Sequence, residues 1–216
     1  MVVMATITAI IYNTWPLGFI LNNPIAHRDL ASQLEATGQP YNWLFVSTDV
    51  LTGLIVIILA MMFWRRLEKG QSILAIKIIV IGLLMFGLFT AVSALVPLTC
   101  QTTDLRCGSH LYQIFGLHDL TGGIAAIGLF ISLVGGWLHG ENKPHALTSK
   151  LIHWTTILWC LCGIAYVYFS AVNQHMVLVQ QIFLVLSGIA VIVICLPTDT
   201  LILAEHLLIS NDDTLT

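Results

Sequence analysis

Charged side chains are scarce in this sequence. Lys, Arg, Asp and Glu make up only 9% of its 216 residues, whereas a soluble globular domain carries about 25%. A chain with so few charges cannot cover a water-facing surface, and 57% of its residues are hydrophobic. The net charge of −3 also gives no reason to expect nucleic acid as a partner. The composition therefore predicts an integral membrane protein.

Long apolar runs occupy nearly the whole length, and each membrane-spanning helix needs roughly 20 such residues. We expect an all-α bundle of about six transmembrane helices, formed by residues 1–196, and a cytoplasmic C-terminal tail at 197–216. The first run begins without the basic residues that open a signal peptide, so we interpret it as a retained span that Asn13 and Pro16 interrupt. The spans are expected at about Val2–Leu21, Asn42–Trp64, Ser72–Leu98, Leu111–Leu138, Leu151–Val172 and Met176–Leu196.

Basic residues are unevenly distributed between the two sets of loops, and cytoplasmic loops carry the excess of Lys and Arg. This rule predicts a multi-pass protein of a cell membrane, of the bacterial inner-membrane type, with both termini in the cytoplasm. With the N-terminus inside, the inner side collects Arg65, Arg66, Lys69, Lys77, Lys143 and Lys150, and the outer side keeps Arg28 and Arg106.

Two of the five cysteines, Cys100 and Cys107, lie in one short loop that the charge rule places outside the cell. Disulfides persist in that compartment, so we expect a bridge that pins the hairpin between the third and fourth spans; two free thiols are the alternative. Cys160, Cys162 and Cys195 fall within spans, where we expect them to pack as small apolar residues.

Three ionisable residues lie inside predicted spans, where such side chains are costly and are functional hypotheses by default. They are Asp49 in the second span and the adjacent His118 and Asp119 in the fourth. At about eight residues from the outer ends, Asp49 and His118 lie at a similar depth, roughly 10 Å at 1.5 Å per residue. We interpret His118 as a catalytic base or polar anchor that the two carboxyl groups orient. Asp119 is expected to face the bundle, as part of one helix face with Gly122 and Ala126.

Further polar residues are expected at the same level of the outer half. Such a layer predicts a polar cavity that binds, or takes part in modifying, a membrane lipid or a lipophilic small molecule. Whether the protein is an enzyme stays open, because the sequence contains no phosphate loop, nucleophile elbow or dinucleotide fingerprint. The candidate substrate-binding residues are Ser93, Tyr166, Tyr168, Gln180 and Gln181.

Two other interpretations remain. Buried polar networks also serve only to lock helix packing, so the chain is alternatively a non-enzymatic structural or accessory subunit that contacts a partner membrane protein. Transport is disfavoured because the sequence shows no internal repeat of the kind that builds inverted-repeat transporters.

The cofactor is left unknown by the sequence. Zinc requires three or four His, Cys or carboxylate ligands, and Asp49, His118, Asp119 and His110 offer that number. No span contains a His-x-x-x-His or Glu-x-x-His pattern, however, so the metal site is incomplete. Haem is disfavoured because the histidines that could pair, such as His139 with His153, lie at span ends.

Four short segments together resemble a known family of bacterial and archaeal membrane proteins, the domain of unknown function 998 family. The stretch from Ser32 to Pro40 resembles its Ser-Glu-Leu-Gly-Ala-x-Gly-x-Pro segment, and Val96-Pro97 resembles its Phe-Pro-x-Asp element. His118-Asp119-Leu120 is similar to its His-Asp-Leu element, and Val179 to Ile182 is similar to its Gln/Glu-Arg-Ile element. The resemblance implies a six-helix fold and supplies no settled activity.

The chain departs from the family pattern at three positions. Gln33 stands where the family has Glu, Gln181 where it has Arg, and Thr99 where it has Asp. If the family Glu and Arg form an ion pair, the resemblance implies that neutral amides here preserve a contact between the loop before the second span and the sixth span, without the charges.

Overall fold

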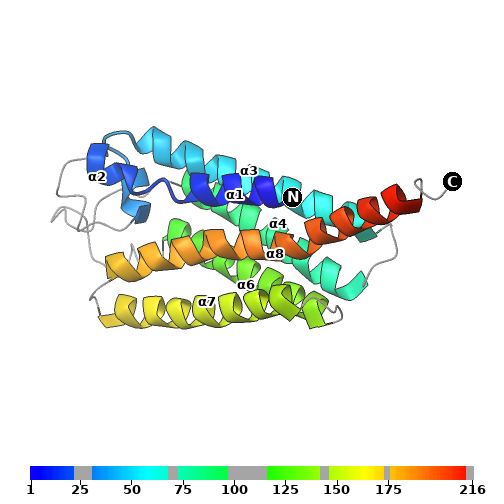
Figure 1. Cartoon of the computed structure of the whole chain (residues 1–216). Coiled ribbons are helices and arrows are strands. Elements are labelled where there is room, and N and C mark those ends of the chain that lie inside the picture. The colour runs from blue at the N-terminus through cyan, green and yellow to red at the C-terminus, as the bar shows by residue number, and fades with distance from the viewer. Residues whose placement is uncertain (22–30, 68–72, 97–115, 142–145, 173–175, 213–216) are drawn as a thin grey trace.

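A computed structural model describes residues 1–21, 31–67, 73–96, 116–141, 146–172 and 176–212. All regular elements in these ranges are helical, and six stretches are long and apolar enough to cross a membrane. The predicted all-α transmembrane bundle is thereby confirmed (Figure 1). The elements are α1 (Val2–Tyr12), α2 (Leu17–Leu21), the 3-10 helix η2 (Ala31–Glu35), α3 (Asn42–Leu67), α4 (Ile73–Leu95), α6 (Leu117–Glu141), α7 (Ala146–Val172) and α8 (Met176–Asp212).

Two helices differ from their expected boundaries in ways that matter for function. The fourth span was expected to start near Leu111, whereas α6 begins at Leu117, directly after Gly116, a residue type that commonly marks helix ends. His118 and Asp119 therefore lie in the first turn of α6 rather than two turns inside it. The sixth apolar span ends at Leu196 as expected, but the helix that contains it, α8, continues through Pro197 to Asp212. The cytoplasmic placement of residues 197–216 stays a prediction.

The first span is interrupted where the sequence predicted. Helix α1 ends at Tyr12, and the chain resumes as α2 at Leu17, after Pro16. The side chain of Asn13 stabilises this interruption, because its nitrogen donates hydrogen bonds to the carbonyl oxygens of Ala9 (2.9 Å) and Leu184 (3.5 Å). The interruption is thus tied to α8 rather than left as an unsupported kink.

The spans form a ring in which each contacts the next. In Figure 1 the helices lie side by side, and the contacts run from α1 to α3, α4, α6, α7 and α8 and back to α1, while α6 also touches α8. Small residues allow the closest approaches, as is common in membranes. A Cβ added to Gly53 of α3 would overlap the carbonyl oxygen of Gly87 in α4. One added to Gly128 of α6 would lie 2.6 Å from the backbone nitrogen of Phe86.

The interior of the ring changes character along its length. In the half that is distant from η2, most buried side chains are apolar and form one continuous core, with a few buried polar residues such as Ser132 and Thr156. In the half near η2, called here the η2 half, the same helices turn polar groups inward. The apolar core includes Val56, Leu59, Phe63, Ile76, Ile79, Leu83, Leu129, Leu133, Val191 and Ile194. The buried polar side chains of the η2 half include Gln33, Glu35, Thr52, Thr90, Ser93, Thr121 and Ser187.

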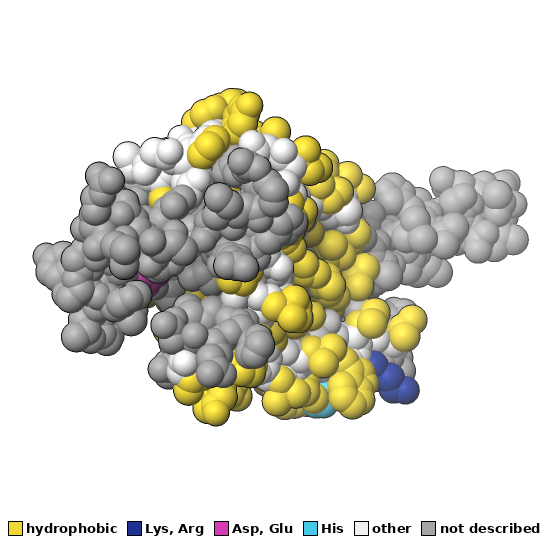
Figure 2. Space-filling model, turned by 90° about the vertical axis from the view of Figure 1, so that its left-hand side faces the viewer, with side chains coloured by type: hydrophobic (Ala, Val, Ile, Leu, Met, Phe, Trp, Pro, Cys, Tyr) yellow, Lys and Arg dark blue, Asp and Glu magenta, His cyan; other side chains and the backbone are white. Residues whose placement is uncertain are grey.

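The outer surface of the spans is hydrophobic, as lipid contact requires. Leu54, Ile81, Leu88 and Ile164 are among the large apolar side chains exposed along the helices. In Figure 2, which looks onto the end that carries η2, hydrophobic side chains predominate on the described flank of the bundle. Of the cysteines, Cys195 is buried in the core, and Cys160 and Cys162 are half-buried on α7, in accord with their predicted packing role.

Candidate functional site

Two carboxyl groups meet at the η2 end of the bundle. Glu35, the last residue of η2, is 6% exposed, and its side chain is hydrogen-bonded to Asp49 on the second turn of α3. Tyr12, the last residue of α1, lies close enough to both carboxyl groups to interact with them electrostatically. Two carboxyl groups that share a hydrogen bond hold at least one proton between them, because two adjacent negative charges repel.

Burial favours the protonated form of Glu35. Its burial, the adjacent charge of Asp49 and the hydrogen bond to Asp49 together raise the pKa of Glu35 well above its ordinary value. A protonated Glu35 donates this hydrogen bond to Asp49. The pair therefore shares at least one proton and carries at most one negative charge.

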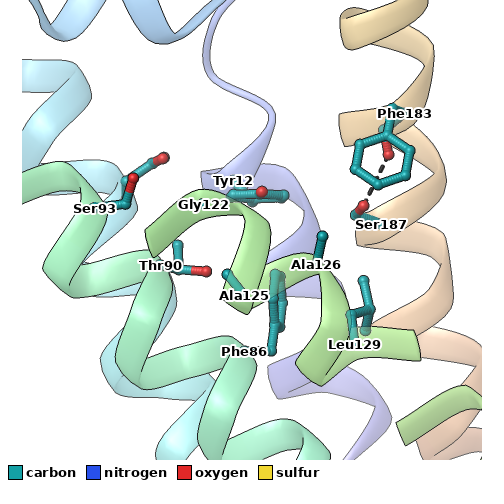
Figure 3. A pocket seen from close by; sticks show the side chains of 11 residues that line it. Tyr12, Phe86, Thr90, Ser93, Gly122, Ala125, Ala126, Leu129, Phe183 and Ser187 are labelled. Atoms are coloured by element: carbon teal, nitrogen blue, oxygen red, sulfur yellow. Dashed lines mark hydrogen bonds between the residues drawn. The ribbon is translucent and has the colours of Figure 1, made fainter. Parts of the chain in front are cut away.

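A cavity of about 80 Å³ borders Asp49 in the centre of the η2 half. Five spans enclose it, and Figure 3 shows the side chains of α4 and α6 converging on it from opposite sides. Since a water molecule in the liquid occupies roughly 30 Å³, the cavity exceeds a single water and is small beside a whole lipid. Its walls are Tyr12, Asp49, Phe86, Thr90, Ser93, Gly122, Ala125, Ala126, Leu129, Phe183 and Ser187.

One hydroxyl of the cavity wall has no hydrogen-bond partner among the described residues. Thr90 is 5% exposed, its Oγ1 makes no hydrogen bond there, and in Figure 3 its oxygen points away from α4 toward Ala125 of α6. The hydroxyls of Ser93 and Ser187, by contrast, donate to the carbonyl oxygens of His118 (3.1 Å) and Phe183 (2.8 Å). An unsatisfied buried hydroxyl costs about 1–3 kcal/mol, so Thr90 is the wall group with a hydrogen bond still to make.

His118 secures the end of α4. Its Nδ1 lies 2.9 Å from the carbonyl oxygen of Ser93, in the last turn of that helix, and 3.1 Å from that of Val96, directly after it. Carbonyl oxygens only accept, so Nδ1 carries a proton. The ring is therefore oriented by backbone groups at the end of α4, and not by Asp49 as the sequence predicted, since Asp49 is bonded to Glu35.

Asp119 does not face the cavity. The expectation that it shares an inward face with Gly122 and Ala126 holds for those two residues, which line the cavity, but Asp119 itself is exposed. The reason is the late start of α6, which places Asp119 in the first turn, where a carboxylate interacts favourably with the helix dipole. It lies within electrostatic range of Tyr166 on α7.

Gln180 of α8 connects the predicted polar residues to η2. Its side chain is hydrogen-bonded to Tyr166, and its Oε1 accepts a hydrogen bond from the backbone nitrogen of Ala31 at 2.7 Å. Its Nε2 lies 3.4 Å from the hydroxyl of Ser32, to which it donates. Gln180 therefore fixes the short helix that contains Glu35 next to α3. The contact between Gln33 and Gln181 that the family resemblance implied stays a prediction.

The remaining candidates lie elsewhere. Tyr168 is 61% exposed and packs edge-on against Phe169, so it points away from the cavity. Gln181 is half-buried and is not part of the cavity wall. Cys100, Cys107 and His110 lie outside the described residues, so the disulfide stays a prediction. Within the described part of the chain, no three His, Cys, Asp or Glu residues come together in a way that would hold a metal ion.

Glu35 is the site residue that sequence reasoning missed. Its position between the first and second predicted spans indicates a loop, where a Glu side chain is ordinarily solvated. The sequence feature that could have indicated its burial is its context. Glu35 is the single charged residue between Ser32 and Pro40, directly before a span that contains an isolated Asp. A buried acid on one element often has its partner on the next, but only the fold shows that η2 turns back against α3.

Comparison with known proteins gives one match. A family model described as "Protein of unknown function (DUF998)" matches residues 4–197. No curated protein and no solved structure matches the chain. The matched region contains Glu35, Asp49 and the whole cavity wall. The chain therefore belongs to the DUF998 family, as an integral membrane protein of uncharacterised activity.

Proposed function

We propose that this protein binds the polar end of a lipid or another lipophilic small molecule in the cavity of the η2 half. The observation that carries the proposal is the unpartnered hydroxyl of Thr90 at the wall of an 80 Å³ cavity, as far as the described residues extend. A membrane protein has little reason to keep a void with an unsatisfied polar group inside its spans, because both the void and the lost hydrogen bond are destabilising. A ligand headgroup removes both costs.

The size and lining of the cavity favour a headgroup rather than a whole molecule. The wall combines the polar groups of Thr90, Ser93 and Asp49 with the apolar side chains of Phe86 and Leu129. Such a combination of a few polar groups with apolar surface is typical of sites for small amphipathic molecules. The proposal concerns binding; a reaction that uses Nε2 of His118 as a base remains a further hypothesis.

We further propose that the end of the bundle that carries η2 lies at the outer side of a cell membrane. Arg65, near the end of α3, and Lys77, near the start of α4, lie at the opposite end of the bundle from η2. Cytoplasmic ends carry the excess of basic residues, and this favours a cytoplasmic position for that end and for both termini. The cavity then lies in the half of the bilayer that faces the outside.

Native mass spectrometry of the protein released from mild detergent tests the proposal. We expect the wild-type chain to retain a lipid or lipophile, and Thr90→Val to lose roughly 5- to 150-fold in retention, because the substitution removes one buried hydrogen bond worth about 1–3 kcal/mol. Thr6→Val is the matched control, since Thr6 is exposed on α1 and its hydroxyl bonds only to the backbone of its own helix.

Equal retention by wild type, Thr90→Val and Thr6→Val would overturn the assignment of the ligand to this cavity. A bare chain in every spectrum would overturn the binding proposal itself. A stoichiometric second protein in place of a lipid would instead support the alternative function, an accessory subunit of a membrane assembly. The observation that favours this alternative is that His118 is engaged in holding α4, a packing role.

A further inference from the structure

The cavity is bordered by one acidic side chain, Asp49, and no basic side chain lies in its described wall. Glu35 and Asp49 share at least one proton, and the cavity wall contains no Lys, Arg or His among the residues described. A charge inside a membrane-spanning bundle is costly unless it is paired or hydrated. A positively charged ligand group therefore binds in this cavity more favourably than a neutral one, and an anionic headgroup such as a phosphate binds less favourably.

We propose that the cavity binds the protonated amino group of a lipophilic amine, with Asp49 as its counter-charge and Thr90 as a hydrogen-bond acceptor. This inference rests on the proposed function and names the class of ligand. A primary ammonium group has three N–H donors, and it meets here a carboxylate and a hydroxyl oxygen that lacks a partner among the described residues. Both groups border the same small space, from α3 and from α4.

Aromatic rings favour an ammonium group over a metal ion. Phe86, Phe183 and Tyr12 all line the cavity, and the rings of Tyr12 and Phe86 pack edge to face with centroids 5.8 Å apart. Ring faces attract organic cations, whereas a metal such as Ca²⁺ needs six to eight oxygen ligands. The described residues supply no third carboxylate, Cys or His near the pair.

The carbon chain of the amine lies outside the cavity. About 80 Å³ accommodates an ammonium group with its first methylene groups but not a long hydrocarbon tail. The apolar remainder then stays against the hydrophobic surface of the spans or in lipid. This geometry fits two sources of the same chemistry, a free alkylamine and the amino headgroup of a lipid.

Thermal unfolding of the full chain in detergent, followed by tryptophan fluorescence, tests the inference with octylamine as the probe and 1-octanol as its neutral analogue. A ligand that binds only the folded state stabilises it by RT ln(1 + [L]/Kd). We expect octylamine to raise the melting temperature in a concentration-dependent way and octanol to leave it unchanged. Asp49→Asn is expected to abolish the shift, and Thr90→Val to weaken binding about tenfold or more.

Glu35→Gln removes one acid of the pair and keeps Asp49, so it tests the contribution of Asp49 alone. The substituted side chain is neutral but its amide still donates to Asp49, so the carboxyl of Asp49 remains and an octylamine shift is expected to persist, in contrast to Asp49→Asn; Thr6→Val is the control that is expected to bind as the wild type does. If Asp49→Asn fails to fold, the comparison of Thr90→Val with the exposed Thr6→Val carries the test, with loss of the octylamine shift expected only in the former. An unchanged shift in both Asp49→Asn and Thr90→Val would overturn the inference.

The remaining outcomes separate the inference from the proposed function and identify the source of the amine. Equal binding of octylamine and octanol would contradict the amine preference and leave lipophile binding intact, whereas no shift from either would contradict both. Octylamine binding by the protein in lipid nanodiscs identifies the source of the amine. Displacement of octylamine by phosphatidylethanolamine but not by phosphatidylglycerol supports a lipid headgroup. Displacement by neither supports a free amine.

Discussion

Gly128→Ala is expected to destabilise the protein by about 1–3 kcal/mol, which corresponds to a decrease of roughly 2–12 °C in melting temperature for a chain of this length. The added Cβ would lie 2.6 Å from the backbone nitrogen of Phe86 and 2.8 Å from the carbonyl oxygen of Gly82. Both are backbone atoms, so no side-chain rotation relieves the overlap, and α4 and α6 must move apart. The cavity lies between these helices, so their separation also disturbs the site.

Gly123→Ala provides the control on the same helix. A Cβ at Gly123 would meet no atom within 4 Å, and Ala is favoured over Gly in a helix by about 1 kcal/mol. We therefore expect its melting temperature to stay the same or to rise. If Gly128→Ala and Gly123→Ala shift the melting temperature alike, then α4 and α6 do not approach each other as closely as described.

Stability is expected to fall as the pH rises, because Glu35 holds its proton in the folded state. The pKa of Glu35 is raised well above the ordinary value of 4.5 by burial, by the charge of Asp49 and by their hydrogen bond. A group with a raised pKa contributes full stability below its unfolded pKa and loses it as the pH passes through the folded value. Within that window each proton changes the free energy of unfolding by about 1.4 kcal/mol per pH unit.

Melting temperatures from about pH 4 to about pH 10 measure this dependence, and Glu35→Gln isolates it. The titratable groups that face Glu35 in the described structure are Asp49 on α3 and Tyr12 on α1, and η2 and α8 present the neutral side chains of Ser32 and Gln180. We expect the wild type to lose stability as the pH rises, and Glu35→Gln to show a flatter profile. Parallel profiles for the two proteins would show that Glu35 is not the group that titrates.

The sequence predicted the fold through properties that membranes impose on any chain. Apolar runs of about 20 residues can only be spans, and the break at Asn13 and Pro16 followed from the backbone chemistry of proline. The small residues of the inward face of α6, Gly122 and Ala126, were also recognisable from helical spacing. These features depend on local composition, so one sequence was sufficient to identify them.

The arrangement of the site depended on contacts that local patterns do not contain. Asp49 and Ser93 were placed correctly at the polar level, because isolated polar residues within a span must face the interior. The partner of Asp49 was not predictable, since η2 folds back from a loop whose length and polarity resemble those of a solvated connection. Likewise, the position of Asp119 depended on the start of α6 at Leu117, and no strong capping pattern marks that boundary.

Infrared spectroscopy of the carboxyl groups tests the central claim most directly, namely that Glu35 and Asp49 share one proton beside the cavity. A protonated carboxyl absorbs in a carbonyl band that is separate from the bands of carboxylates and shifts on deuterium exchange. We predict such a band at neutral pH in the wild type and in Thr90→Val, and its loss in Glu35→Gln. A wild-type spectrum without a protonated carboxyl at neutral pH, or a band unchanged in Glu35→Gln, would contradict the account.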